Sequence, residues 1–360
     1  KVNYKSNNSD WGGHHTKLTL NLATGSGAAD LVLVDTGQVG SYLNGGGLED
    51  LTAQFAPFKK DMVAFAVSQG QSESGAQIAV PVDLGPGVMF YRRNYMEDMD
   101  YDVEEVIATW ESWVEYGREL RDNEGVYLVS NADAVARSII YGTVEEGNGI
   151  YTGPNNSILI ESPRFKNAFA LAKQLRDEGL DAATGMWNDD WYNGFKEGTF
   201  ATELSGFWML GHLKGWIAPD TEGDWGVSNL PNGVYGTWGG TFAAIPTQSK
   251  NKEDAWSVIE YMISEDAQVN AFDEWAMFPA NTATYDNELF GEGVDFLRGQ
   301  SGRELAANVA KNVIPVTPGK YDNIAETLVV STALMEVLND GRDIDEALKD
   351  AARQLERRMR

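Results

Sequence analysis

Apolar and polar positions in the first quarter of the chain follow two patterns in turn. Residues 31–34 form a short, wholly apolar run, which is typical of a strand covered on both faces. Residues 77–81 and 88–91 predict two further strands, separated by a Gly- and Pro-containing turn at 82–87. Apolar residues at helical spacing predict a helix before the first run, at residues 14–24. Two more helices are predicted between the first and second runs, one ending at Leu43 and one at 48–66. This alternation predicts an α/β sheet with crossover helices.

The rest of the chain continues as helices interrupted by short strands, and residues 1–5 alternate as a strand does. Helices are predicted at 102–120 (with a second start at Thr109), 132–141, 162–178, 189–195, 208–217, 254–263, 265–275, 322–339 and 344–359, and strands at 200–204, 225–227 and 239–245. After residue 281 the chain also looks helical, with a break at Gly302. No repeat or low-complexity linker occurs, so two lobes would be joined by several ordered crossings.

Composition excludes several classes of protein. The chain has 360 residues, about two domains by length, and 54 acidic against 28 basic residues, for a formal net charge of -26. A field of this sign repels phosphate backbones and anionic membranes, so nucleic acid is not an expected partner. Cysteine is absent and only three histidines occur, which excludes disulfides, thiolate sites and a histidine-rich metal centre. No apolar run reaches the roughly 18–20 residues of a membrane span.

Two carboxylates follow predicted strand ends. Asp35 comes after the run at 31–34, and Asp83 comes after the strand at 77–81. In open α/β sheets ligands bind outside the carboxyl ends of the strands, so both side chains are candidate ligand contacts. Asp35 is equally suited to cap the following helix, and Asp83 to cap the turn at Gly85. Gln38 is a further polar candidate, whose default is a surface position.

The second chemical signal is aromatic. The sequence has 11 Trp, 14 Tyr and 14 Phe, and many of them stand beside Gly or Asp in turn-like sequence. An indole on a loop offers a flat, electron-rich face, and sugar rings present C–H faces that fit it. The candidates are Trp238 with the backbone amides of Gly239 and Gly240, then Trp208, Trp11, Trp191 and Trp275, the last two also being possible core residues. Trp110, Trp113, Trp216, Trp225 and Trp256 fall at predicted core positions.

Short stretches along nearly the whole chain resemble one protein family, in family order. They are residues 28–32 (AADLV), 46–51 (GGLEDL), 81–86 (PVDLGP), 90–93 (FYRR), 109–111 (TWE), 195–198 (FKEG), 205–208 (SGFW), 225–227 (WGV), 230–231 (LP), 238–240 (WGG), 243–246 (AAIP), 249–256 (SKNKEDAW) and 341–348 (GRDIDEAL). Each is weak alone, and their joint order is specific. The sequence resembles the extracellular solute-binding proteins of carbohydrate ABC importers, in the branch related to maltose-binding protein.

The resemblance implies a two-lobe periplasmic-binding-protein fold of the class II type, each lobe a mixed sheet flanked by helices, with the ligand in the cleft between them. Carried over, the first lobe comprises residues 1–86 plus 239–311 and the second 87–237 plus 313–360, with hinges near 85–87, 235–238 and 312–316. Family members carry a strand and helix before the position of Lys1, so about 30 further N-terminal residues are expected.

The function implied by the resemblance is binding of a carbohydrate, di- or oligomeric, and its delivery to the membrane permease of an importer. The protein would be an extracytoplasmic monomer with no catalytic residue, cofactor or metal, in the periplasm or anchored by lipid. Two alternatives stay open. One is the same fold binding a polyol, a glycerol phosphodiester or a polyamine. The other is a glycoside hydrolase, which needs two carboxylates about 5–9.5 Å apart.

Two clusters suggest metal sites only at first sight. His14 and His15 are adjacent, so on a helix their side chains diverge, and we interpret them as a surface feature. Asp189–Asp190 and the pair Asp343 and Asp345 lack the spacing of a calcium-binding loop and are better explained as helix caps.

Overall fold

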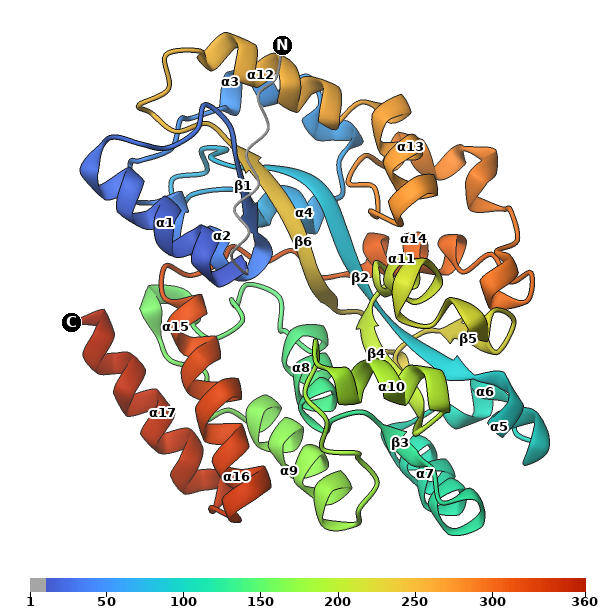
Figure 1. Cartoon of the computed structure of the whole chain (residues 1–360). Helices are drawn as coiled ribbons and strands as arrows, with labels where there is room; N and C mark the ends of the chain where they lie inside the picture. The colour runs from blue at the N-terminus through green and yellow to red at the C-terminus, as the bar shows by residue number, and fades with distance from the viewer. Residues whose placement is uncertain (1–10) are drawn as a thin grey trace.

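The computed structural model describes residues 11–360, without the side chains of Trp11 and Gly12 (Figure 1). The predicted strand at 1–5 and the candidate side chain of Trp11 lie outside the described residues. Six strands form one mixed sheet in the order β1-β6-β2-β4-β3, with β5 also paired to β2. Their bounds are β1 Val32–Asp35, β2 Val80–Arg92, β3 Tyr127–Val129, β4 Phe200–Gly206, β5 Trp225–Ser228 and β6 Thr237–Ala244. The β3–β4 pair is parallel, and the other pairs are antiparallel.

Strand β2 runs through both lobes of the molecule. Residues 80–86 pair with β6, whereas residues 87–92 pair with β4 and β5. We call the part built on β1, β6 and the start of β2 the first lobe, and the part built on β3, β4 and the end of β2 the second lobe. The long strand can be followed between them in Figure 1.

The prediction of two strands separated by a turn at 82–87 is wrong. Every residue of β2 except Asp83 is buried, and its backbone pairing continues from β6 at residues 80–86 to β4 and β5 at residues 87–92. The Gly- and Pro-containing part does not end the strand. It only shifts the register between β2 and β6, once between Pro81 and Asp83 and once between Leu84 and Pro86. Gly85 is required here, because a Cβ atom at this position would lie 1.8 Å from the carbonyl oxygen of Trp238.

Helices cover both lobes (Figure 1). In the first half of the chain they are α1 Trp11–Thr24, α2 Thr36–Leu43, α3 Thr52–Phe55, α4 Ala64–Gln69, α5 Arg93–Asp98, α6 Val103–Val106, α7 Trp110–Glu124, α8 Asp133–Gly142 and α9 Pro163–Asp177. In the second half they are α10 Asp189–Glu197, α11 Met209–His212, α12 Lys252–Met262, α13 Glu265–Trp275, α14 Arg303–Asn312, α15 Asp322–Glu326, α16 Met335–Asp340 and α17 Ile344–Met359. None of the helices in the described part of the chain is both long and apolar enough to cross a membrane.

Local sequence explains where several predicted helices begin and break. Thr109 starts α7 with a capping box to Ser112, as the second start within 102–120 predicts. The helix predicted at 48–66 is instead split into α3, a 3-10 turn and α4, because Pro57 cannot continue a helix. The predicted helix after residue 281 begins only at α14, and three short 3-10 turns precede it.

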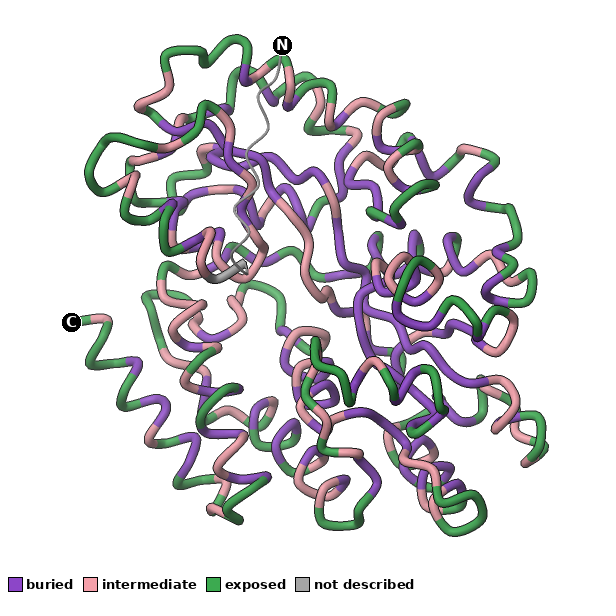
Figure 2. Tube along the Cα trace, in the orientation of Figure 1, coloured by how far each residue is buried: buried purple, intermediate pink, exposed green. Residues whose placement is uncertain are grey.

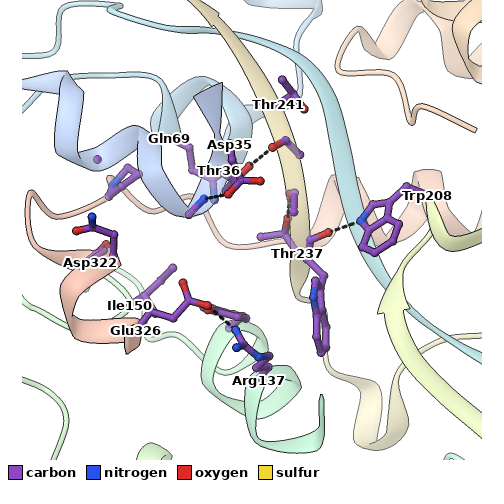
Figure 3. A pocket seen from close by; sticks show the side chains of 18 of the residues that line it. Asp35, Thr36, Gln69, Arg137, Ile150, Trp208, Thr237, Thr241, Asp322 and Glu326 are labelled. Carbon is purple, nitrogen blue, oxygen red and sulfur yellow. Dashed lines mark hydrogen bonds and ion pairs between the residues drawn. The ribbon is translucent and has the colours of Figure 1, made fainter. Parts of the chain in front are cut away.

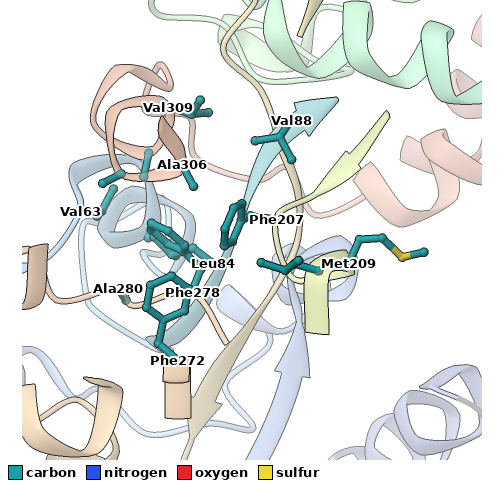
Figure 4. Close-up of a cluster of buried hydrophobic side chains, with 14 of the residues drawn as sticks. Val63, Leu84, Val88, Phe207, Met209, Phe272, Phe278, Ala280, Ala306 and Val309 are labelled. Carbon is teal, nitrogen blue, oxygen red and sulfur yellow. The ribbon is translucent and has the colours of Figure 1, made fainter. Parts of the chain in front are cut away.

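The buried residues follow the sheet and the inner faces of its flanking helices (Figure 2). One cluster continues past the point where β2 changes lobes, since it contains both Leu84 and Val88 together with Phe207 and Phe278 (Figure 4). Helix α14 contributes Ala306 and Val309 to the same cluster. This continuous packing joins the two lobes along β2.

Candidate functional site

A cleft of about 1310 Å³ lies between the lobes. The first lobe lines it with residues of β1, α2, β2 and β6, and the second lobe with residues of α8, α11 and α15 and of the loops at 150–151 and 185–187. Figure 3 shows Asp35 and Thr241 facing this space from one side and Arg137 and Glu326 from the other. A ligand in the cleft therefore contacts both lobes.

Asp35 and Asp83 stand in one row of the sheet. Both are register partners of Thr241, because β6 lies between β1 and β2. Residues in one row project to the same face, and two strand spacings place their Cα atoms roughly 10 Å apart. Asp35 also caps α2, with its Oδ1 accepting the backbone N–H of Gly37 at 2.8 Å. The capping interpretation of Asp35 is therefore confirmed, and the same side chain lines the cleft, where its contact with a ligand stays a prediction.

The pKa values of the Asp35 and Asp83 carboxyls are both raised above the ordinary value for aspartate. Burial raises the pKa of Asp35 to about 6, and the nearby charge of Glu326 adds to the rise. Burial raises the pKa of Asp83 to about 7, with the charge of Asp35 in the same direction, although hydrogen bonds from Thr241 oppose it. Near neutral pH these groups can donate or accept hydrogen bonds, as a polyhydroxylated ligand requires.

Glycines bring the backbone of β6 to the edge of the cleft. Gly239 and Gly240 have φ of +78° and +119°, a region that favours glycine. A Cβ on Gly240 would lie 3.0 Å from Thr36 Oγ1 and 3.1 Å from the carbonyl oxygen of Asp83. Thr36 Oγ1 donates to the carbonyl oxygen of Gly240 at 2.9 Å, which ties α2 to this strand.

The opposite wall carries the one arginine among the lining residues. Arg137 on α8 pairs with Glu326 on α15 and lies 3.4 Å from Asp133 Oδ2. Asp322 accepts the N–H of Gly319 at 2.8 Å, and burial raises its pKa to about 7. Because its guanidinium is already paired, Arg137 offers little to an anionic ligand, and the cleft disfavours a phosphodiester.

An aromatic wall completes the cleft. We use this name for Trp187, Trp208 and His212, whose rings are in mutual contact. The Trp187 and Trp208 rings stack with centroids 5.9 Å apart and planes at 18°, and His212 meets both edge-on. Trp208 Nε1 donates to the carbonyl oxygen of Trp238 at 2.7 Å, which fixes its ring to β6. Stacked indoles of this kind present the flat apolar face that a sugar ring fits.

The structure brings most of the predicted site residues together and separates others. Asp35, Asp83, Trp208, Trp238, Gly239, Gly240 and Trp275 line the cleft. Trp275 stands at its margin with 68% of its surface exposed. Gln38 is not among the lining residues, but its Oε1 accepts from Asn323 Nδ2 at 3.3 Å, between α2 and α15. Trp191 is fully buried in the core, in edge-on contact with Phe195, and does not reach the cleft.

Two placements differ from the sequence interpretation. His15 is buried, and its Nε2 accepts the backbone N–H of Asp35 at 3.1 Å, so it supports the strand end that presents this carboxyl. Trp216 is 52% exposed instead of lying in the core, because only one face of its helical segment packs inward.

Among the lining residues that sequence reasoning missed are Trp187, Arg137, Tyr141 and Glu326. Trp187 had a usable signal, since it lies between Gly185 and the helix cap Asn188, in the same loop context that identified Trp238. The other three lie inside helices, where nothing local distinguishes a cleft residue from a surface one. Within residues 13–360, no group of three or more acidic or histidine side chains is placed to hold a metal ion.

A two-lobed α/β fold with a ligand-sized cleft between the lobes is the architecture of a solute-binding protein. The family model for bacterial extracellular solute-binding proteins matches residues 1–269, and the chain belongs to this family. Among its relatives, a lactose-binding protein of Rhizobium radiobacter is 25% identical over 92% of this chain and 80% of its own length. An arabinooligosaccharide-binding protein of Halalkalibacterium halodurans is 22% identical over 96% of this chain and 80% of its own length.

Solved structures share the fold. An extracellular solute-binding protein of family 1 superposes with a TM-score of 0.85 at 22% identity, over 99% of this chain and 92% of that one. A transporter-associated binding protein from B. animalis subsp. lactis, in complex with β-1,6-galactobiose, superposes with a TM-score of 0.81 at 25% identity. The superposition covers 99% of this chain and 90% of that one.

Proposed function

We propose that this protein binds a di- or oligosaccharide in the cleft between its lobes and delivers it to the permease of an ABC importer. The observation that carries the proposal is the composition of the cleft. Carboxylates and backbone groups of the sheet line the same space of about 1310 Å³ as the aromatic wall. Hydroxyl partners and flat apolar faces are the two features that a sugar presents together. The names of the relatives, which bind lactose and arabinooligosaccharides, support the same class of ligand.

The mechanism is lobe closure without catalysis. A ligand that contacts both lobes stabilises the closed arrangement, and the permease recognises that arrangement. We propose the hinge at the crossings near residues 85–87, 235–238 and 312–316, which join the first lobe (1–86 plus 239–311) to the second (87–237 plus 313–360). The protein acts outside the cytoplasmic membrane, as its family implies.

A thermal-shift screen tests the proposal. Mono- and oligosaccharides form the test series, with a polyamine and a glycerol phosphodiester as controls. A ligand at 100 times its Kd stabilises the protein by about 2.7 kcal/mol, which raises Tm by several degrees. We expect a shift with one sugar series that is lost in Asp83→Ala. A shift with a control alone, or turnover of an aryl glycoside by the wild type, contradicts the proposal.

A further inference from the structure

Glu203 is a buried titratable group for which the proposed binding mechanism gives no role. It lies on β4, opposite Phe90 of β2, with only 1% of its surface exposed. Neither carboxyl oxygen makes a hydrogen bond of good geometry, and the polar side chains that approach it are those of Ser130 and Trp191. A buried carboxyl without good hydrogen bonds costs stability, so its presence in a packed strand calls for a reason.

The neighbours of Glu203 are polar groups that support the cleft. They are Ser130, just before the cleft residue Asn131, and the indole of Trp191 on α10. The charge of Asp133 on α8, which also lines the cleft, acts on Glu203 and raises its pKa. Trp191 Nε1 is itself buried without a hydrogen bond of good geometry. The Trp191 N–H and the Glu203 carboxyl are therefore a buried donor and acceptor that lie near each other and interact without a hydrogen bond of good geometry.

Trp191 connects this buried pair to the aromatic wall. Its ring centroid lies 5.2 Å from that of Trp187, and the Trp187 ring stacks on Trp208. Trp187 has a φ of +65°, a conformation that is unfavourable for a bulky residue, and 47% of its surface is exposed. Contacts with other side chains are therefore needed to keep its ring in place. Asn188 fixes the start of α10 by accepting the N–H of Trp191 at 3.0 Å. Support for the exposed ring of Trp187 thus comes from Trp191 below it.

We propose that Glu203 is a positioning residue for the aromatic wall: its carboxyl orients the Trp191 indole, on which Trp187 rests. The inference depends on the proposed function only for its effect on sugar affinity. The contact between Glu203 and Trp191 can be measured without any ligand. Burial raises the pKa of Glu203 to about 8, and Ser130 and Trp191 oppose this rise.

The ligand-free test is intrinsic tryptophan fluorescence between pH 6 and 9.5. Ionisation of a carboxyl beside an indole changes the emission of that indole. The wild type is expected to show a transition near pH 8 that is absent in Glu203→Gln and in Trp191→Phe. Glu197→Gln, at the exposed end of the same helix, removes the same charge and should retain the transition. A wild-type transition that persists in Glu203→Gln overturns the proposal.

The binding test compares affinity with stability. Glu203→Leu removes a buried carboxyl that makes no hydrogen bond of good geometry, so its Tm should stay equal or rise. Its Kd for the best sugar of the screen should rise roughly tenfold, the scale of losing one good contact. Glu203→Gln keeps an acceptor for the indole and should restore the affinity to within about twofold, and Glu203→Leu combined with Trp191→Phe should be no worse than either alone.

The outcomes separate this inference from the proposed function. If no sugar binds the wild type while the fluorescence transition behaves as expected, the proposed function fails and the Glu203–Trp191 contact stands. If sugar binds and Glu203→Leu binds it as the wild type does, the positioning role is wrong. A lower Tm together with a weaker affinity in Glu203→Leu means that Glu203 serves the fold in general, and this also overturns the proposal.

Discussion

The stability of the protein is expected to fall as pH rises, because of Asp83. The pKa of this carboxyl is raised from an ordinary 3.8 to about 7 in the folded state. The folded protein therefore holds a proton that the unfolded chain has released between these two values, and folding stability decreases with pH across that window. Below about pH 4 both states are protonated and the cost disappears.

The magnitude follows from the size of the shift. About three pKa units, at about 1.4 kcal/mol each, give an upper limit of about 4 kcal/mol. Asp83→Asn removes the ionisation and keeps an oxygen that can accept from Thr241. The variant should thus exceed the wild type in free energy of unfolding by about 1 kcal/mol or less at pH 4.5, and by up to about 4 kcal/mol at pH 8.

Urea unfolding at a series of pH values measures this difference. Asp98→Asn makes the same substitution at an exposed carboxyl at the end of α5, and its effect should be small at every pH. A constant difference between Asp83→Asn and the wild type from pH 4.5 to pH 8 would refute the reasoning, as would a variant that is less stable at pH 8.

Three further predictions concern the cleft. Trp208→Ala should raise the Kd for the sugar roughly 30-fold, a loss of about 2 kcal/mol, whereas Trp256→Ala, on α12 and outside the cleft, should leave it unchanged in calorimetric titrations. Gly240→Ala should lower the free energy of unfolding by roughly 1–3 kcal/mol because of its φ and its close neighbours, while Gly215→Ala, with open space around it, should not, as denaturant titration will show. Sugar affinity should rise between pH 6 and pH 8 as Asp83 becomes the stronger, charged acceptor, and this rise should vanish in Asp83→Asn.

Most of the fold could be predicted from local pattern. The run at 31–34 became a strand, and Thr109 and Gly198 delimit helices as their cap chemistry indicates. The long strand β2 could not be predicted, because Gly85 and Pro86 normally mark a turn. Here the close approach of the Trp238 carbonyl and the pairing of residues 80–86 with β6 outweigh that preference.

The candidate site was predictable where side chains follow strand ends or stand among glycines. Asp35, Asp83 and Trp238 are of this kind, and all line the cleft. Arg137 and Glu326 come from helices far apart in the sequence, and only tertiary packing brings them together. Trp191 has the same loop-like context as Trp187, and the fold alone decides which of the two rings is buried.

The most direct test of the central claim is the crystal structure of the protein with the sugar that stabilises it most. We expect density for the sugar between the two lobes, with its hydroxyls on Asp35 and Asp83 and a ring face against Trp208 or Trp187. A sugar bound elsewhere on the surface, or a cleft left empty at a saturating concentration, would contradict it.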